Sequence, residues 1–127
     1  MRGHEVVVVV RRGEQFLVVE RSPARGGYWN LVAGGVETDE TAGAAALREL
    51  EEETGLRAEV TPLGLELGYV GASGRVRLDA FVVDAPPGWE PTLDEEHVAY
   101  RWCSAAEAVE LLAYEEPRVA VRAAVAA

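Results

Sequence analysis

Apolar residues along this chain follow the spacing of strands more often than that of helices. Residues 5–11 form a β-branched run without a helical period, and residues 15–21 return after a short Arg-Gly-Glu turn. Together they predict a buried strand and the second strand of a hairpin. Apolar and polar residues alternate along 75–83, and another strand is expected at 97–103, after the long irregular segment 84–96.

Three stretches carry helix signals. Thr41 is a good N-cap for an alanine-rich stretch, and Gly55 stands where a left-handed C-cap ends a helix. Ser104 is expected to cap a second helix that runs through Leu112, and Pro117 is expected to open a third. The first helix separates two groups of strands.

The remaining segments are short. Residues 22–28 contain one proline and two glycines and predict a surface loop, and residues 31–33 predict a short strand. Residues 57–60 and 63–70 are expected to be extended, with a turn at 72–74. Strands, one crossover helix, further strands and terminal helices together predict an α/β domain.

Negative charge gathers where a helix disfavours it. Glu49, Glu51, Glu52 and Glu53 crowd the C-terminal turns of the first helix, where the macrodipole is negative and neighbouring carboxylates repel. Three of them share a face beside an acidic loop, which favours hard cations such as Mg²⁺ or Mn²⁺. The alternative is a solvated acidic face.

The spacing of this region resembles that of a known family. Five residues separate Gly34 from Glu40, and seven more separate Glu40 from Arg48. The fixed positions that follow are Glu49, Leu50, Glu52, Glu53, Gly55 and Leu56. This pattern matches the signature box of the Nudix hydrolases, the MutT-like pyrophosphohydrolases. The resemblance implies a single Nudix domain over 1–127, with a mixed β-sheet sandwiched between α-helices.

The resemblance also implies roles for individual residues. The implied metal site consists of Glu49, Glu52, Glu53, Gly34 and Glu40. The implied catalytic residues are Glu49, Glu52, Arg48 and Glu96. Gly34 would permit close approach to the metal, Glu40 would support the loop or the metal shell, and Arg48 would orient a carboxylate. Glu49 would act as metal ligand or base. A distant acid would act as general base or extra metal ligand, and the candidates are Asp94, Glu95 and Glu96, of which Glu96 is preferred. Leu50 and Leu56 are expected in the core.

Two further stretches resemble particular branches of the family. Residues 29–37 resemble the dihydroneopterin triphosphate pyrophosphatases. Glu96-His97, with Tyr100 and Trp102, resembles a stretch that this branch shares with dinucleoside tetraphosphate hydrolases. The alternative is that His97 is a structural histidine and both aromatic residues belong to the core. The box departs from its common form at Asp39, where glycine is usual; aspartate tolerates the left-handed conformation.

Candidate substrate contacts lie outside the box. Arginine forks could hold phosphates, and aromatic rings could stack on a base or pterin. The candidates are Arg21, Arg25, Trp29, Arg77 and Phe81, with Tyr28 and Trp89 as further rings. Core packing and plain surface charge are the alternatives for these residues.

The composition of the chain argues against nucleic acids and membranes as binding partners. The 127 residues suffice for one domain, and a net charge of -10 argues against binding a nucleic-acid backbone. All 12 basic residues are arginine. Cys103 is the only cysteine and is expected to be buried, and no apolar run is long enough to span a membrane. A cytoplasmic monomer or homodimer that acts on a small molecule is therefore expected.

Three functions follow from these observations. The first is a Mg²⁺-dependent or Mn²⁺-dependent pyrophosphohydrolase of a nucleoside triphosphate or dihydroneopterin triphosphate, which releases a monophosphate and pyrophosphate. The second is a dinucleoside polyphosphate hydrolase. The third, of another class, is a non-catalytic nucleotide-sensing module, which is disfavoured because such modules commonly lose box glutamates and none is missing here.

Overall fold

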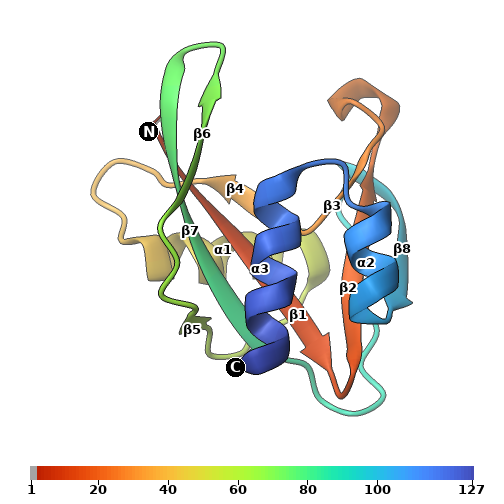
Figure 1. Ribbon diagram of the computed structural model, residues 1–127. Helices are drawn as coiled ribbons and strands as arrows, with labels where there is room; N and C mark the ends of the chain where they lie inside the picture. Colours follow the sequence, from red (N-terminus) through yellow and green to blue (C-terminus); the bar gives the residue numbers. More distant parts are fainter. Residues whose placement is uncertain (1–2) are drawn as a thin grey trace.

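One mixed sheet organises the molecule, and the structure, a computed structural model, describes residues 3–127 of it (Figure 1). Its central strand is β1 (His4–Arg12), which pairs antiparallel with β2 (Gln15–Arg21) and β4 (Val32–Gly35) and parallel with β7 (Gly74–Asp84). The first two residues of the expected domain lie outside the described range.

In residues 3–127, four further strands pair with β2 and β7. β3 (Trp29–Asn30) and β8 (His97–Cys103) pair with β2, while β5 (Thr61–Pro62) and β6 (Leu67–Gly71) pair with β7. The helices are α1 (Ala42–Thr54), α2 (Ala105–Leu111) and α3 (Glu115–Ala126), and the 3-10 turn η1 (Pro23–Arg25) follows β2. The mixed sheet and its helices confirm the predicted α/β class.

The sheet is buried on both faces, which explains the unbroken apolar run of β1. Val6, Val8 and Val10 pack with α1, whereas Val7 and Val9 pack with α2 and α3. Figure 1 shows α1 behind the sheet and the other two helices in front of it. A strand covered on both sides has no solvent face and therefore no polar alternation.

The helix signals were read correctly, with one exception. Thr41 accepts a hydrogen bond from the N–H of Ala44 (3.1 Å), Gly55 ends α1 with a φ of 82°, and a complete capping box begins α2 at Ser104. The last helix was predicted to open at Pro117, but it begins at Glu115. Proline still lies in the first turn, where its missing N–H removes no helical hydrogen bond.

Two strand predictions were also wrong in extent. The segment 57–60 is irregular, and β6 begins at Leu67 rather than at residue 63. Gly64 has a φ of 70°, a turn conformation that interrupts the pairing with β7. The single strand expected at 31–33 is two strands, because β3 pairs with β2 and β4 pairs with β1.

Asp39 behaves as its chemistry predicts. Its φ of 67° is the only positive value among the non-glycine residues described in 3–127. The loop thus keeps the left-handed turn without the usual glycine. None of the helices found in these residues is long and apolar enough to cross a membrane.

Candidate metal and catalytic site

The carboxylates of α1 face a cavity of about 460 Å³ between α1, β4, and the ends of β2 and β8. We call it the acidic cavity. Its lining includes Glu49, Glu52, Glu53, Arg48, Gly34, Gly35, Arg21, Arg25, Asp94 and Glu96, with Glu5, Tyr28, Asn30, Ala33 and Tyr69 along one side. Most of the predicted catalytic and metal-binding residues therefore meet in one place.

Gly34 and Glu49 are fitted to each other. A Cβ atom on Gly34 would lie 1.4 Å from Oε2 of Glu49, far inside contact distance. The pairing of Val6 with Gly34 in the sheet fixes β4 in this position beneath α1. A side chain at position 34 would therefore displace the Glu49 carboxylate.

Two of the carboxylates are held in an unfavourable setting. Burial raises the pKa of Glu53 to about 9, and repulsion from Glu49 adds to the shift. Burial likewise raises the pKa of Glu49 to about 7; Arg48 opposes this rise, while Glu52 adds to it. Buried carboxylates without enough positive partners are the arrangement that a bound cation would relieve.

Arg48 and Glu40 form a clamp outside the acidic group. Nε and Nη2 of Arg48 donate to the two oxygens of Glu40 at 2.9 and 3.0 Å, and Nη2 also donates to the carbonyl of Gly35 at 2.9 Å. This fork lowers the pKa of Glu40 to about 2. Glu40 therefore supports the loop through Arg48, and it does not line the acidic cavity.

The same guanidinium reaches toward the cavity. Nη1 of Arg48 lies 3.5 Å from Oε1 of Glu49 and 3.6 Å from Oε2 of Glu52. Glu52 is 57% exposed and free to turn, whereas Glu49 is only 13% exposed. Glu51 does not line the acidic cavity and pairs with Arg57.

A buried histidine stands behind Glu53. Nδ1 of His97 lies 2.7 Å from Asp94 Oδ1, and Nε2 lies 3.6 Å from Glu53 Oε1. This Nε2 is the one buried side-chain nitrogen or oxygen without a hydrogen-bond partner in residues 3–127. His97 thus lies within ion-pair distance of Glu53 without a hydrogen bond to it. The sequence singled out His97 and the acidic run that contains Asp94, but not the pairing of these two residues.

Glu96, the predicted distant base, also lines the acidic cavity. Its Oε2 accepts a long hydrogen bond of 3.4 Å from Arg25. Arg21 is held nearby, because its Nε donates to the carbonyl of Arg25 at 3.0 Å. Two arginines and a carboxylate thus face the α1 glutamates across the cavity.

The donor set fits a hard divalent cation by its chemistry. Three carboxylates from one helix supply the oxygen ligands that Mg²⁺ and Mn²⁺ take. Among the residues described, no group of three or more acidic, histidine or cysteine side chains is already arranged to hold a metal ion. Glu52, turned toward Arg48, would have to swing inward.

The remaining predicted substrate residues lie elsewhere. Phe81 is 5% exposed and packs in the core beside α1, and Trp29 packs against the core on the opposite face. Arg77 is 72% exposed and pairs with Asp79. None of the three lines the acidic cavity.

Tyr100 and Trp102 have a structural role that the sequence left open. The hydroxyl of Tyr100 and Nε1 of Trp102 both donate to Glu90 Oε1, at 3.1 and 2.8 Å, and Arg12 donates to the other oxygen at 2.7 Å. They fix the irregular segment to the sheet. Cys103 is buried, as expected.

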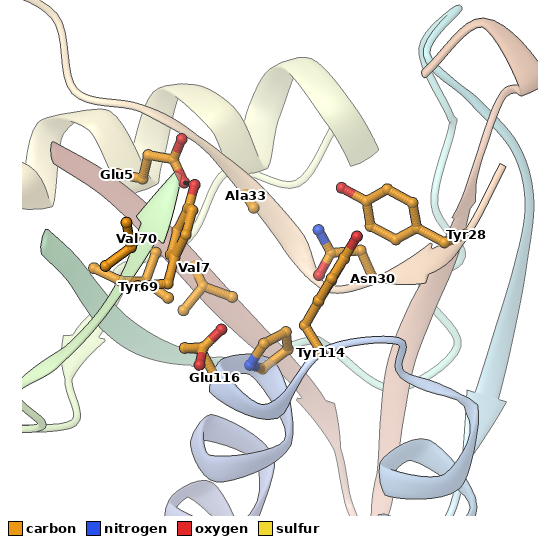
Figure 2. Close-up of a pocket in the computed structure, with 11 residues that line it drawn as sticks. Glu5, Val7, Tyr28, Asn30, Ala33, Tyr69, Val70, Tyr114 and Glu116 are labelled. Atoms are coloured by element: carbon orange, nitrogen blue, oxygen red, sulfur yellow. Dashed lines mark hydrogen bonds between the residues drawn. The ribbon is translucent and has the colours of Figure 1, made fainter. Parts of the chain in front are cut away.

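Beside the acidic cavity lies a second one of about 350 Å³, which we call the aromatic cavity (Figure 2). Tyr28 was foreseen as a possible ring contact, whereas Tyr69, Tyr114, Asn30 and Glu116 were not. They come from separate strands and from the start of α3, so no spacing in the sequence joins them. Tyrosines in a chain otherwise rich in small apolar residues were the only feature of the sequence that pointed to this cavity.

Comparisons with known proteins agree with this geometry. A model of the NUDIX domain matches residues 1–124. The chain is 37% identical over 132 residues to an octanoyltransferase of Myxococcus xanthus; the match covers 99% of this chain but only 37% of that relative's length. It is 36% identical over 115 residues to CTP pyrophosphohydrolase of Escherichia coli K12, covering 83% of this chain and 78% of the relative.

The fold has a solved counterpart. The structure of the E. coli dihydroneopterin triphosphate pyrophosphohydrolase matches with a TM-score of 0.86 and 24% identity, covering 95% of this chain and 93% of that one. Identity this low supports the fold alone, whereas the family match extends over almost the whole chain. The chain therefore belongs to the Nudix hydrolases, a family whose members act on nucleotide pyrophosphate bonds.

Proposed function

We propose that the acidic cavity hydrolyses a phosphoanhydride of a nucleoside triphosphate or of dihydroneopterin triphosphate, releasing a monophosphate and pyrophosphate. The observation that carries this proposal is the meeting of Glu49, Glu52 and Glu53 with Arg21 and Arg25 in one cavity. The name of one similar protein, a CTP pyrophosphohydrolase, supports the reaction type.

Glu49, Glu52 and Glu53 would hold Mg²⁺ or Mn²⁺, which members of this family generally need. When bound, the cation neutralises phosphate charge and lowers the pKa of an attached water. Gly34 leaves room for the Glu49 carboxylate. Glu40 acts through Arg48, which holds the loop against the helix that carries the ligands.

The other residues bind substrate and move a proton. Arg21 and Arg25 offer guanidinium groups to the phosphates. Glu49 or Glu96 accepts a proton from the attacking water, whose oxygen bonds to phosphorus as the bond to the leaving pyrophosphate breaks. Both carboxylates line the cavity, so either can reach a water placed there.

The test is product identification. Purified protein is incubated with Mg²⁺ and a panel of nucleoside triphosphates, dihydroneopterin triphosphate, diadenosine tetraphosphate and ADP-ribose. We expect free pyrophosphate and a monophosphate from at least one triphosphate, and no turnover in EDTA. Nucleotide products without pyrophosphate, from diadenosine tetraphosphate alone, would favour the dinucleoside polyphosphate reaction instead. Intact substrates throughout would reject the proposal.

A further inference from the structure

The aromatic cavity opens directly onto the acidic cavity. Five residues line both: Glu5, Tyr28, Asn30, Ala33 and Tyr69. A substrate with its phosphates against α1 therefore has a continuous path for the group at its other end. A volume of about 350 Å³ lies within the range of small-molecule sites.

Tyrosines form the two walls of this cavity. Figure 2 shows Tyr69 with Glu5 on one side, and Tyr114, Tyr28 and Asn30 on the other. Tyr28 and Tyr114 meet edge to face, with ring centroids 5.2 Å apart, and the hydroxyl of Tyr69 donates to Glu5 at 2.6 Å. Both contacts hold the rings in place, so the cavity offers fixed aromatic faces to a flat ligand.

Glu116 supplies an unused carboxylate. It lies in the first turn of α3, is half-buried, and lines the aromatic cavity but not the acidic one. In the described part of the chain it has no hydrogen-bond or ion-pair partner, whereas its neighbour Glu115 lies 3.7 Å from Arg118 and 3.6 Å from Arg122. A half-buried carboxylate on the wall of a cavity is suited to receiving N–H donors from a ligand.

Asn30 supplies the complementary donor. Its Oδ1 accepts the backbone N–H of Leu31 at 2.9 Å, and its amide NH₂ has no partner in residues 3–127, so this residue of the cavity lining has a donor to offer. The aromatic cavity thus offers one carboxylate acceptor that is free on both oxygens and one amide donor, between tyrosine faces. A matching ring carries two adjacent N–H donors beside a carbonyl.

We propose that the aromatic cavity binds the ring of the substrate, and that Glu116 selects rings with the 2-amino-4-oxopyrimidine edge found in guanine and in pterins. This inference rests on the proposed function for its choice of triphosphates. The ring N–H and the amino group both donate to Glu116, and the carbonyl accepts from Asn30. Uracil lacks the amino group, while adenine and cytosine place an acceptor nitrogen next to theirs, so none offers two adjacent donors to a carboxylate.

The test compares GTP with ITP, which differ by one amino group, and adds dihydroneopterin triphosphate as a second ligand that carries the same edge. ITP carries the guanine ring without its 2-amino group, so kcat/KM for GTP and for dihydroneopterin triphosphate is measured against that for ITP. We expect at least one of the amino compounds to exceed ITP by at least about tenfold. The stronger of the two identifies the source of the ring.

Variants assign the preference to one side chain. Glu116→Gln keeps the shape but presents an amide NH₂ to the ligand's donors, so the preference over ITP should fall to about twofold or less. Glu115→Gln is the matched control, because it removes a charge from the same helix turn outside the cavity. It should leave the preference intact.

Two results would overturn the inference: equal use of ITP and both amino compounds by the unaltered protein, or the same preference in Glu116→Gln as in Glu115→Gln. Binding of GMP and IMP, measured by calorimetry, separates this failure from failure of the proposed function. Tighter GMP binding that Glu116→Gln abolishes would support the ring site even if no triphosphate were split. Equal binding of GMP and IMP would reject it.

Discussion

Two groups of side chains in this molecule are centred on glutamates and behave in opposite ways. Glu90 accepts from Arg12, Tyr100 and Trp102, and these bonds lower its pKa. Glu49 and Glu53 are more buried than Glu90 and accept fewer hydrogen bonds, and the pKa values of both are raised. In the first group three side chains donate to one carboxylate, whereas in the second the carboxylates outnumber the donors.

The direction of the pKa shift separates carboxylates that stabilise the fold from carboxylates that are arranged to bind a ligand. The Glu90 group ties an irregular segment to β8 and the end of β1. The carboxylates of the α1 group repel one another in a cavity, and this repulsion lowers the stability of the fold unless a cation binds there. If this comparison is right, removing the same charge should have opposite consequences in the two places.

The largest effect is expected on turnover. Glu52→Gln removes a ligand charge without changing shape, and we expect kcat/KM to fall on the order of 10²–10³-fold with the fold intact by circular dichroism. Glu51→Gln, one residue earlier on the same helix and paired with Arg57, should stay within about twofold of the original rate. Equal rates for both variants would remove Glu52 from the site.

Gly34→Ala tests the fit between β4 and α1. The added Cβ would meet the end of the Glu49 side chain rather than backbone, so Glu49 should rotate away and the fold should survive. We expect turnover to fall by about 10–100-fold, because displacement of a reacting group is costly. The control is Gly43→Ala in α1, where an added Cβ meets nothing within 4 Å. It should stabilise the helix by about 0.5–1 kcal/mol and leave turnover unchanged.

A smaller effect is expected on stability as pH changes. Glu53 titrates near 4.5 when unfolded and near pH 9 when folded, so between these values the folded state holds a proton that the unfolded state lacks. Stability without metal should therefore fall as pH rises, by up to about 1.4 kcal/mol per pH unit. Melting temperatures from pH 5 to 9 in EDTA measure this slope.

Glu53→Gln and Mg²⁺ should each flatten that slope. The amide oxygen can still accept the N–H of Ala33, and it has no proton to lose, so this variant should be more stable than the original protein at pH 8 in EDTA. Excess Mg²⁺ should stabilise the original protein most at high pH, where its ligands ionise without competition from protons. A slope unchanged in Glu53→Gln would place the titrating group elsewhere.

Local rules predicted most of the fold. Caps at Thr41, Gly55 and Ser104 were visible because capping depends on neighbours within one turn. The boundaries that failed depend on pairing at a distance. The split between β3 and β4 arises because β2 and β1 take different partners, which no local pattern records.

The residues of the site also divide into those that the sequence could group and those that it could not. The box glutamates share one helix, so their spacing alone brings them to one cavity. Phe81 and Arg77 belong to the same strand yet lie respectively in the core and on the surface, and the aromatic cavity joins β1, β6 and α3. Residues brought together by the sheet, rather than by a helix period, could not be grouped from the sequence.

The smallest effect is expected at Glu90, and it completes the comparison. Glu90→Gln leaves an amide nitrogen facing Arg12 or the indole N–H of Trp102, so a donor meets a donor, and melting at pH 8 should drop slightly. Because its pKa is lowered, the contribution of this carboxylate is present at neutral pH and lost as pH falls, so the deficit should narrow in acid. Turnover and the response to Mg²⁺ should not change, since Glu90 lies outside both cavities. The same substitution thus lowers stability at Glu90 and raises it at Glu53 under identical conditions. A rise in both would mean that net charge, and not the local balance of donors and carboxylates, governs these acids.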